Sequence, residues 1–332
     1  MIKVCHMTSA HEEEDIRIFR KECVSLAEAG YDVYLVERGD SYDKNGVHIV
    51  GVGEIPTSRL KRMTEGAKMV YQAARALDAD IYHFHDPELL PYGLKLKKAG
   101  KKVIFDSHEM YTEQIREKPY LPHWFARLLS HAYGKYESHV LGRIDGLVYT
   151  CLKDGVHPFA GKCRHITTID NTPMLWELYD RYDPAAKKEA GSVVYVGGLS
   201  YARGITHLIT AAAKADCTLY LAGMFDSEEY RHTVEALPGY SCVQYLGLLG
   251  REQVVALLQR CCVGAATLLN IGQYNQDDNL ATKVYEYMSL GIPVLLSRSA
   301  YNERVMNQYH FGLCVEPDNV CLLYTSPSPR DR

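Results

Sequence analysis

The sequence has 332 residues, enough for two domains with separate cores. A net charge of -4 and 23% charged residues exclude the strongly basic surface of a nucleic-acid-binding protein, so we expect no nucleic-acid partner. No apolar run reaches the roughly 18 residues that cross a bilayer, and the first residues enter a strand without a signal peptide. The ten cysteines include no C-x-x-C pair, which favours reduced thiols and a cytoplasmic protein.

The first half of the chain alternates between short apolar runs and amphipathic runs with helical periodicity. Such alternation predicts a doubly wound α/β domain with a parallel sheet. The expected strands are 2–7, 32–36, 81–84, 103–105, 146–150 and 165–169, and the expected helices are 16–29, 59–77, 90–99 and 125–141.

The alternation stops at residues 172–191, which contain Pro173, Pro184 and clustered charges, and it then resumes. We therefore predict an N-terminal domain over 1–171, a linker over 172–191 and a C-terminal domain over 192–317. Both should be Rossmann-like and should bind ligands at the carboxyl ends of their strands, in a cleft where the two domains face each other. Residues 318–332 lack periodicity and carry two Ser-Pro steps, so we expect a non-native tail outside the fold.

An acidic loop, a short helix, a glycine and an apolar strand follow one another over residues 277–294. Thr282 is the expected cap of the helix, and Gly291 its left-handed terminus. Lys283 and Glu286 are three residues apart and so share one face. The helix dipole and Lys283 suit a phosphate, and Glu286 suits a vicinal diol such as a ribose. The alternative is an ion pair on the surface of an ordinary helix.

The C-terminal domain opens with a strand that runs into Gly197 and Gly198, followed by Arg203 and a helix. Glycines allow close approach of the backbone, and a helix N-terminus with a nearby cation can bind a diphosphate. The alternative is a tight turn that binds nothing.

The motif around the short helix resembles a known signature. Asp278 and Glu286 are carboxylates separated by seven residues and followed by Gly-x-Pro at 291–293. This resembles the donor-binding signature of retaining glycosyltransferases of family 4. The resemblance covers roughly residues 1–317 and implies the GT-B fold. It implies that Glu286 holds the donor ribose and that Asp278, one methylene shorter than the family's usual Glu, helps to orient the donor sugar. Asn279 is a further candidate for donor contact.

The resemblance also has a consequence for the donor diphosphate. The family usually carries two basic residues in the glycine loop, whereas Gly198 occupies the first of those places here and only Arg203 remains. Arg203 and Lys283 should therefore neutralise the diphosphate in place of a metal ion. No cofactor and no metal are expected, and the nucleotide-sugar is a substrate.

Polar side chains follow two strands of the N-terminal domain. The family has a histidine near the donor sugar where His108 stands here, and His85 and Asp86 follow another strand. Hydrogen bonding to sugar hydroxyls is the expected role of both, with His108 a catalytic candidate that orients the donor sugar and Asp86 an acceptor-side candidate. A helix cap or strand-end packing is the alternative. A metal ion at His85, Asp86 and His108 is a further alternative, but this spacing matches no known metal motif.

His11 and Asp15 lie in the first loop of the chain. A branch of the family that acts on polysaccharide and lipid-linked intermediates is similar in carrying His11, Asp15, Arg17 and Lys21, which makes His11 and Asp15 acceptor-side candidates. Alternatively, Asp15 caps the following helix, and Arg17 and Lys21 form its solvated face.

The basic helix 59–77, with Trp124 and Phe125, could rest on an anionic membrane surface, or the helix could simply be solvated. Together these features predict a retaining glycosyltransferase that moves a sugar from a nucleotide-sugar to a glycan or lipid-linked acceptor in polysaccharide or cell-envelope biosynthesis. It would act in the cytoplasm, with peripheral contact at the inner face of the membrane as one option. Two other functions stay open: a nucleotide-sugar 2-epimerase and a non-catalytic nucleotide-sugar-binding protein.

Overall fold

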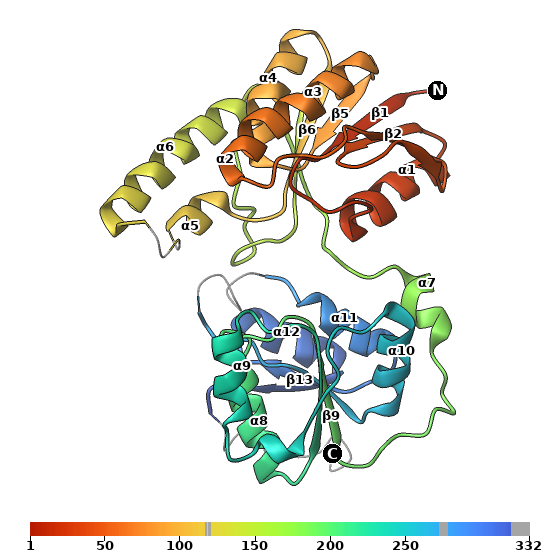
Figure 1. Ribbon diagram of the computed structural model, residues 1–332, viewed down its shortest axis with the longest axis vertical. Coiled ribbons are helices and arrows are strands. Elements are labelled where there is room, and N and C mark those ends of the chain that lie inside the picture. The colour runs from red at the N-terminus through yellow and green to blue at the C-terminus, as the bar shows by residue number, and fades with distance from the viewer. Residues whose placement is uncertain (117, 119–120, 272–277, 320–332) are drawn as a thin grey trace. The chain divides into compact units, whose positions relative to one another are not determined.

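The computed structural model describes residues 1–332 except 117, 119–120, 272–277 and 320–332, so Asp277 and most of the expected tail lie outside the described residues. The chain separates into two compact units. Unit 1 comprises residues 1–151 and 156–171, and unit 2 comprises residues 152–155 and the chain from 172 onward. Each unit contains one open sheet with helices packed on both of its faces, which confirms the predicted α/β class (Figure 1).

Unit 1 is built on an eight-stranded sheet in the order β3-β4-β2-β1-β5-β6-β7-β8. All neighbouring strands are parallel except β3, which pairs antiparallel with β4. The strands are β1 Lys3–Met7, β2 Asp32–Glu37, β3 Tyr42–Lys44, β4 Val47–Gly51, β5 Ile81–Phe84, β6 Lys102–Ser107, β7 Gly146–Tyr149 and β8 His165–Thr168. The helical segments are η1 Ile16–Cys23, α1 Val24–Glu28, α2 Arg59–Lys61, η2 Arg62–Gly66, α3 Ala67–Ala76, η3 Pro87–Leu89, α4 Leu90–Lys98, α5 Tyr111–Arg116 and α6 His123–Leu141.

The β3–β4 hairpin is absent from the elements expected from the sequence. Its loop is Asn45-Gly46, and both residues have positive φ, 50° and 76°. A two-residue loop with positive φ at both positions matches the twist of an antiparallel pair, and Asn-Gly is its usual sequence. The signal was therefore present in the chain, but the two strands are too short for their alternation to be recognised.

The two faces of the unit 1 sheet differ in polarity. Along β1, Cys5 and Met7 join the apolar core, whereas His6 between them points to the opposite face, because successive side chains of a strand alternate. The same alternation places His83 of β5 and Asp106 of β6 on the face of His6, which η1 covers. The apolar face is packed by α3, α4 and α6 against Tyr82, Phe84, Val103, Phe105, Leu147 and Tyr149.

Unit 2 has a fully parallel six-stranded sheet in the order β11-β10-β9-β12-β13-β14. The expected linker 172–191 forms α7 and η4 at its start, and Leu178 is buried in the core of unit 2. The strands are β9 Ser192–Val196, β10 Thr218–Ala222, β11 Val243–Tyr245, β12 Val263–Ala266, β13 Val294–Ser297 and β14 Gly312–Val315. The helical segments are α7 Leu175–Leu178, η4 Tyr179–Arg181, α8 Ile205–Lys214, α9 Glu228–Glu235, η5 Tyr240–Cys242, α10 Arg251–Arg260, α11 Thr282–Ser289 and α12 Ala300–Tyr309.

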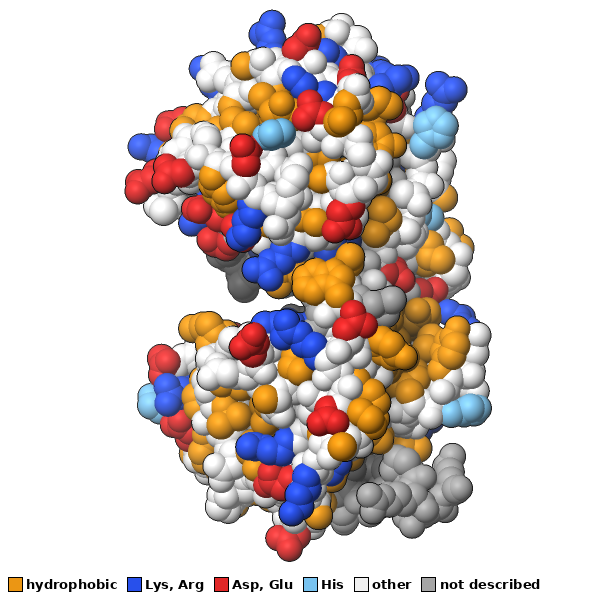
Figure 2. All heavy atoms as spheres, turned by 90° about the vertical axis from the view of Figure 1, so that its right-hand side faces the viewer, with side chains coloured by type: hydrophobic (Ala, Val, Ile, Leu, Met, Phe, Trp, Pro, Cys, Tyr) orange, Lys and Arg blue, Asp and Glu red, His pale blue; other side chains and the backbone are white. Residues whose placement is uncertain are grey.

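The surface carries charges of both signs. Figure 2 shows Lys and Arg side chains interspersed with Asp and Glu over the face that it displays, in keeping with the small net charge. None of the helices in the described part of the chain combines the length and apolar character that crossing a bilayer requires.

Glu37, at the end of β2, gives the stability of unit 1 a pH dependence. Burial and the charges of Glu13 and Glu14 raise its pKa to about 7, although it accepts a hydrogen bond from the Glu14 N–H. The folded state binds this proton more tightly than the unfolded chain. The stabilisation is therefore complete below the unfolded pKa of about 4.3 and is lost as the pH rises through 7. We expect Glu37→Gln to raise the melting temperature above about pH 8 and to change it little near about pH 4, in thermal unfolding followed by circular dichroism. Exposed Glu28→Gln is the control, and an equal effect at both pH values would contradict the assignment.

Candidate functional site

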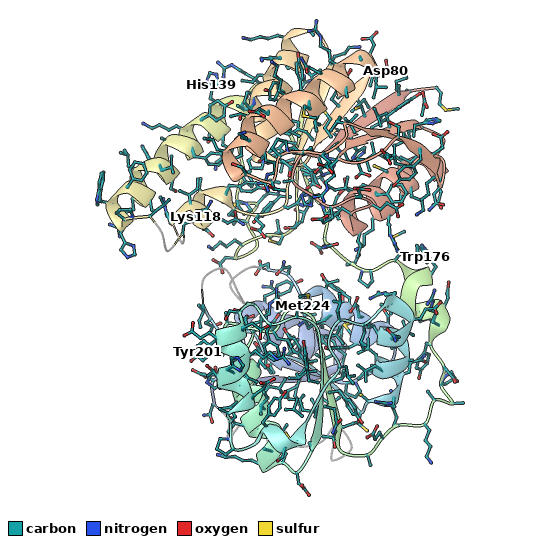
Figure 3. All side chains as sticks on the ribbon, in the orientation of Figure 1. Asp80, Lys118, His139, Trp176, Tyr201 and Met224 are labelled. Carbon is teal, nitrogen blue, oxygen red and sulfur yellow. The ribbon has the colours of Figure 1, made fainter. Side chains whose placement is uncertain are left out.

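The loop between β9 and α8 lies at the carboxyl-terminal edge of the unit 2 sheet, the edge at which Figure 3 labels Met224 just beyond β10. Gly197 has φ 133°, and Gly223 of the neighbouring strand has φ 141°. A Cβ on Gly223 would lie 1.9 Å from the carbonyl oxygen of Gly197, so both positions need glycine. The backbone at this edge is thus open to close approach by a ligand.

Lys283 of α11 is a buried cation beneath this loop. Its Nζ lies 3.4 Å from the centre of the Tyr195 ring and 3.1 Å from the place that a Cβ on Gly197 would occupy. Among the described residues, Nζ has no hydrogen-bond partner. Burial, and secondarily the charge of Arg203, hold the pKa of Lys283 well below its usual range. A buried ammonium without an acceptor is costly, and a bound anion would remove that cost.

Arg203 lies on the other side of the same loop. Its Nε is 3.4 Å from the place that a Cβ on Gly198 would take, so glycine at 198 leaves room for the guanidinium. Gly204 follows with φ 72° and begins α8, where a Cβ would lie 2.0 Å from the carbonyl oxygen of Thr267. Glycine at 198 thus lets Arg203 approach the backbone of the loop, and Gly204 lets the start of α8 pack against Thr267, which follows β12.

Glu286 lies one turn beyond Lys283 on α11, and its charge acts on the pKa of Lys283. Its side chain is 13% exposed, and its Oε1 accepts a hydrogen bond of 2.7 Å from Nη1 of Arg251 at the start of α10. Sequence reasoning missed Arg251, because it is 35 residues away and carries no motif. The arginine fixes the carboxylate at the edge of the sheet, where it can accept hydrogen bonds from a diol.

The sequence predicted the C-terminal end of α11 correctly but not its N-terminal cap. Thr282 is not the cap: it is the first helical residue, and Ala281 precedes it as the cap, with no side-chain hydrogen bond to the helix start among the described residues. Gly291 does have the left-handed conformation, with φ 64°, as predicted.

Asp278 is held by the backbone. Its Oδ2 accepts a hydrogen bond from the N–H of Gly155, and its own N–H donates to the carbonyl of Leu152 at 2.8 Å. Nη2 of Arg304 lies 3.8 Å from the same Oδ2. Asn279 beside it is exposed. Oδ2 of Asp278 therefore holds this loop to residues 152–155.

Unit 1 contains a pocket of about 880 Å³ at the carboxyl end of β5 and β6. Three of the predicted residues, His11, Asp86 and His108, line it together with apolar side chains. The structure therefore brings two acceptor-side candidates, His11 and Asp86, and the donor-sugar candidate His108 into one cavity. The apolar and aromatic lining includes Leu60, Met63, Pro87, Tyr111, Leu129, Tyr133 and Tyr136.

His11 sits between two carboxylates in this pocket. Its Nδ1 lies 3.4 Å from Asp15 and its Nε2 lies 3.5 Å from Asp86. Burial lowers the pKa of His11, but the hydrogen bond to Asp15 and the charges of Asp86 and Asp15 outweigh burial and raise it overall. The imidazole thus favours its protonated form, which donates from both nitrogens.

Asp15 and Asp86 also have structural partners. Asp15 caps η1 by accepting from the N–H groups of Arg17 and Ile18. Asp86 accepts from Thr8 Oγ1 at 2.9 Å and from the N–H groups of residues 9 and 10 at 2.6 and 3.2 Å. The first loop of the chain is therefore folded around Asp86, and the capping alternative for Asp15 is confirmed.

Arg17 is not part of a solvated face, contrary to that alternative. It is 6% exposed and binds Asp106 in a bidentate pair, with Nε to Oδ2 at 3.0 Å and Nη2 to Oδ1 at 3.1 Å. Its Nη1 donates to the carbonyl of Ile169. Burial raises the pKa of Asp106, but hydrogen bonds from His108 and His85 and the charge of Arg17 hold it well below the usual range. Lys21, by contrast, is at the surface and donates to Asn171.

A chain of histidines runs inward from the pocket. Nε2 of His108 lies 3.2 Å from Nδ1 of His85, and Nε2 of His85 lies 3.0 Å from Nδ1 of His6. His83 and Glu22 complete the cluster. His6, Glu22 and His83 were not predicted as site residues, although the alternation of His83 and His85 with Tyr82 and Phe84 shows that the histidines share one face. Two groups among the described residues could hold a metal ion: His6, Glu22, His83 and His85, and His85, Asp106 and His108.

Two sequence models of known families match the chain. The family described as Glycosyl transferases group 1 matches residues 180–323, and the family described as Glycosyltransferase Family 4 matches residues 19–152. No curated protein sequence matches significantly.

Solved structures resemble the chain over almost its whole length. A sucrose-phosphate synthase from Thermosynechococcus elongatus has a TM-score of 0.72 at 16% identity, covering 98% of this chain and 88% of that one. HepE from Anabaena in complex with UDP has a TM-score of 0.64 at 14% identity, covering 97% and 87%. WaaG, a glycosyltransferase involved in lipopolysaccharide biosynthesis, has a TM-score of 0.66 at 14% identity, covering 99% and 91%. At these identities the likeness shows the fold, which is that of GT-B enzymes.

The sequence models account for the greater part of both units, and the fold agrees with them independently. The chain is thus an enzyme that belongs to the family 4 glycosyltransferases, with two Rossmann-like domains of the GT-B fold.

Proposed function

We propose that this protein is a retaining glycosyltransferase that moves a sugar from a nucleotide-sugar donor to a glycan or lipid-linked acceptor in polysaccharide or cell-envelope biosynthesis. The observation that carries the proposal is Lys283, a buried ammonium without a hydrogen-bond partner among the described residues, beneath a glycine loop with Arg203 beside it. A diphosphate in that loop would pair with both cations. The bound UDP of HepE is consistent with such a donor.

In this proposal each residue of unit 2 has a separate task. Lys283 and Arg203 stabilise the negative charge that develops on the leaving diphosphate. Glu286, fixed by Arg251, accepts hydrogen bonds from the ribose. Asp278 helps to orient the donor sugar. In a retaining reaction without a protein nucleophile, the leaving phosphate deprotonates the acceptor hydroxyl on the face from which it departs.

Unit 1 binds the acceptor in this proposal. His11, held between Asp15 and Asp86, presents hydrogen-bonding groups to acceptor hydroxyls in the pocket, and His108, which also lines the pocket, orients the donor sugar. A lipid-linked acceptor is supported by the apolar side chains Leu60, Met63 and Leu129, which line the pocket and are also exposed. Trp124, Phe125 and Leu128 of α6 are exposed as well, so a peripheral contact with the inner face of the membrane, by a cytoplasmic enzyme, would be favourable.

The assay of the function incubates the protein with a panel of nucleotide-sugars, with and without saccharide acceptors, and follows donor and product by NMR. We expect acceptor-dependent transfer in which the product keeps the donor's anomeric configuration. Donor turnover without an acceptor would favour a 2-epimerase instead. Donor binding without any turnover would favour a non-catalytic binding protein, and inversion of the anomeric centre would overturn the retaining mechanism.

Glu286→Ala is expected to raise the donor KM and to lower turnover. The ribose hydroxyls lose the carboxylate that accepts their hydrogen bonds, and Arg251 loses the carboxylate that it binds. A loss of kcat/KM for the donor of about 100-fold corresponds to about 2.7 kcal/mol, which is in the range of a charge-assisted hydrogen bond. Initial rates against donor concentration provide the measurement. The exposed Glu252→Ala on α10 is the matched control, and wild-type kinetics in the Glu286 variant would remove the residue from the donor site.

Transfer is expected to need no divalent ion at the diphosphate, because two cationic side chains supply the charge that Mg²⁺ would otherwise provide. Addition of Mg²⁺, or brief exposure to EDTA, should leave the initial rate within a factor of about two. A strict requirement for Mg²⁺ would show that Lys283 and Arg203 do not suffice.

A further inference from the structure

The polar face of the unit 1 sheet contains a buried cluster that the proposed transfer reaction does not use. His6 of β1 and His83 of β5 are direct neighbours in the parallel register, and His85 follows on the same face. Glu22 of η1 adds a carboxylate to the cluster. Its Oε2 lies 3.9 Å from His6 Nδ1, 4.0 Å from His83 Nδ1 and 3.9 Å from His85 Nε2. Three imidazoles therefore surround a single carboxylate oxygen.

The cluster is only partly satisfied by hydrogen bonds, since His6 and His85 pair with each other. In the part of the chain that the structure describes, both oxygens of Glu22 and the Nε2 atoms of His6 and His83 are buried without a hydrogen-bond partner. Nε of Arg17 lies 3.2 Å from Glu22 Oε1, but its N–H is directed at Asp106. Buried polar groups are almost always paired, so the unpaired carboxylate of Glu22, whose Oε2 faces the three imidazoles, lacks a partner.

We propose that His6, Glu22, His83 and His85 bind a divalent transition-metal ion, and that the ligand set fits Zn²⁺. Three imidazole nitrogens and one carboxylate oxygen are ligands that Zn²⁺ prefers, and four protein ligands make a closed, structural site.

The distances are close to those of a metal site. One ligand atom from each of the four residues can be chosen so that all lie within 4.8 Å of one another. In a tetrahedron with metal–ligand bonds of about 2.0 Å, the ligand atoms are about 3.3 Å apart. The separation of His6 Nδ1 and His85 Nε2 is 3.0 Å, and the three separations from Glu22 Oε2 are 3.9–4.0 Å. These four separations differ from the tetrahedral value by about 0.3–0.7 Å, and the remaining pairs, all within 4.8 Å, exceed it by at most about 1.5 Å, so rotation of the side chains could bring the ligand atoms together.

The surroundings of His85 supply a second, independent indication. Metal-binding histidines usually direct the nitrogen that is not bound to the metal at a carboxylate, which orients the ring. Nδ1 of His85 lies 3.4 Å from Oδ2 of Asp106, on the side away from Glu22. Asp106 is in turn fixed by the bidentate pair with Arg17. Burial lowers the pKa of His6, His83 and His85 and so favours the neutral imidazoles that bind metal ions, whereas burial and the charge of Asp106 raise the pKa of Glu22 to about 9, so an ion bound there would displace the Glu22 proton.

The other candidate group, His85, Asp106 and His108, fits a metal ion less well. Its atoms lie 3.2–3.4 Å apart, but the guanidinium of Arg17 already binds both oxygens of Asp106. A metal ion bound there would lie beside the positive charge of the Arg17 guanidinium. Asp106 therefore acts as the orienting carboxylate of His85 rather than as a ligand.

The experiment uses untagged full-length protein, so that no affinity tag binds metal. Elemental analysis after purification without chelator should find about one equivalent of zinc per chain. Protein stripped with a strong chelator should regain its melting temperature on addition of ZnSO₄, and with CoCl₂ it should develop the intense visible bands of tetrahedral Co²⁺. Wild-type protein that holds no metal, shows no such bands and does not change its melting temperature with Zn²⁺ would overturn the proposal.

Two variants locate the ion. Glu22→Gln and His83→Gln should each lower the affinity for Zn²⁺ by about 100-fold or more, since even changes outside the ligand set cost about 10- to 100-fold. Exposed His131→Gln on α6 is the matched control and should retain wild-type affinity. Equal zinc binding by the wild type and both ligand variants would place the ion elsewhere. Because the Co²⁺ spectrum is read on the wild type, the proposal can be tested even if one variant fails to fold. The ligands all come from unit 1, so the result is independent of whether transfer needs Mg²⁺.

Discussion

Lys283→Met is expected to abolish most of the transferase activity and, at the same time, to stabilise unit 2. In the proposed donor site, the activity falls because the diphosphate loses one of its two cations; removal of one such preorganised donor costs about 100- to 1,000-fold in rate. The stability rises because the wild-type ammonium is buried over the Tyr195 ring without a hydrogen-bond partner among the described residues, and methionine fills a similar volume without that cost.

Opposite signs for activity and stability make this prediction specific. Substitution of a residue that only supports the fold would lower the activity and the stability together. Initial rates and thermal unfolding are measured on the same preparation, with the exposed Lys187→Met as the control. Lys283→Arg should not restore activity fully, because Gly197 and Tyr195 leave little room around Nζ. A Lys283→Met enzyme that is active, or one that is destabilised, would refute the donor-site assignment.

Arg17→Met is expected to destabilise unit 1 by about 3–5 kcal/mol, the cost of leaving one partner of a buried ion pair unpaired. Asp106 is completely buried and loses both bonds of the bidentate pair in this variant, and the carbonyl of Ile169 loses its donor. The loss should shrink at low pH, where the isolated carboxyl group of Asp106 can be protonated. Urea unfolding followed by circular dichroism measures the effect.

The double variant Arg17→Met/Asp106→Asn separates the cost of an unpaired buried carboxylate from the cost of lost packing. Removal of both charges should restore a large part of the stability, since the penalty belongs to the uncompensated carboxylate. Arg20→Met, on the exposed side of η1, is the control and should change stability by less than about 0.5 kcal/mol. An Arg17→Met protein within that range of the wild type would mean that Asp106 is satisfied by His85 and His108 alone.

The sequence by itself determined the class of fold and the order of most elements. The strand β5 at Ile81–Phe84 was predicted with its observed bounds, and the helix α4 at Leu90–Lys98 was predicted to within one residue. An apolar run next to an amphipathic run in an alternating chain forms a strand and a helix of an α/β domain. The donor-side motif was recognisable for a related reason. Lys283 and Glu286 lie on one helical turn, so their spacing in sequence fixes their proximity in space.

Only the tertiary structure decided what those residues contact. Whether Arg17 is solvated or buried depends on Asp106, 89 residues away, and the environment of Glu286 depends on Arg251, 35 residues away. The histidine cluster joins β1, η1 and β5, whose neighbourhood follows from strand order in the sheet and not from any local pattern. Local periodicity decides which face of an element is buried, but the pairing of charges on that face is set by which elements meet, and that is a property of the folded chain.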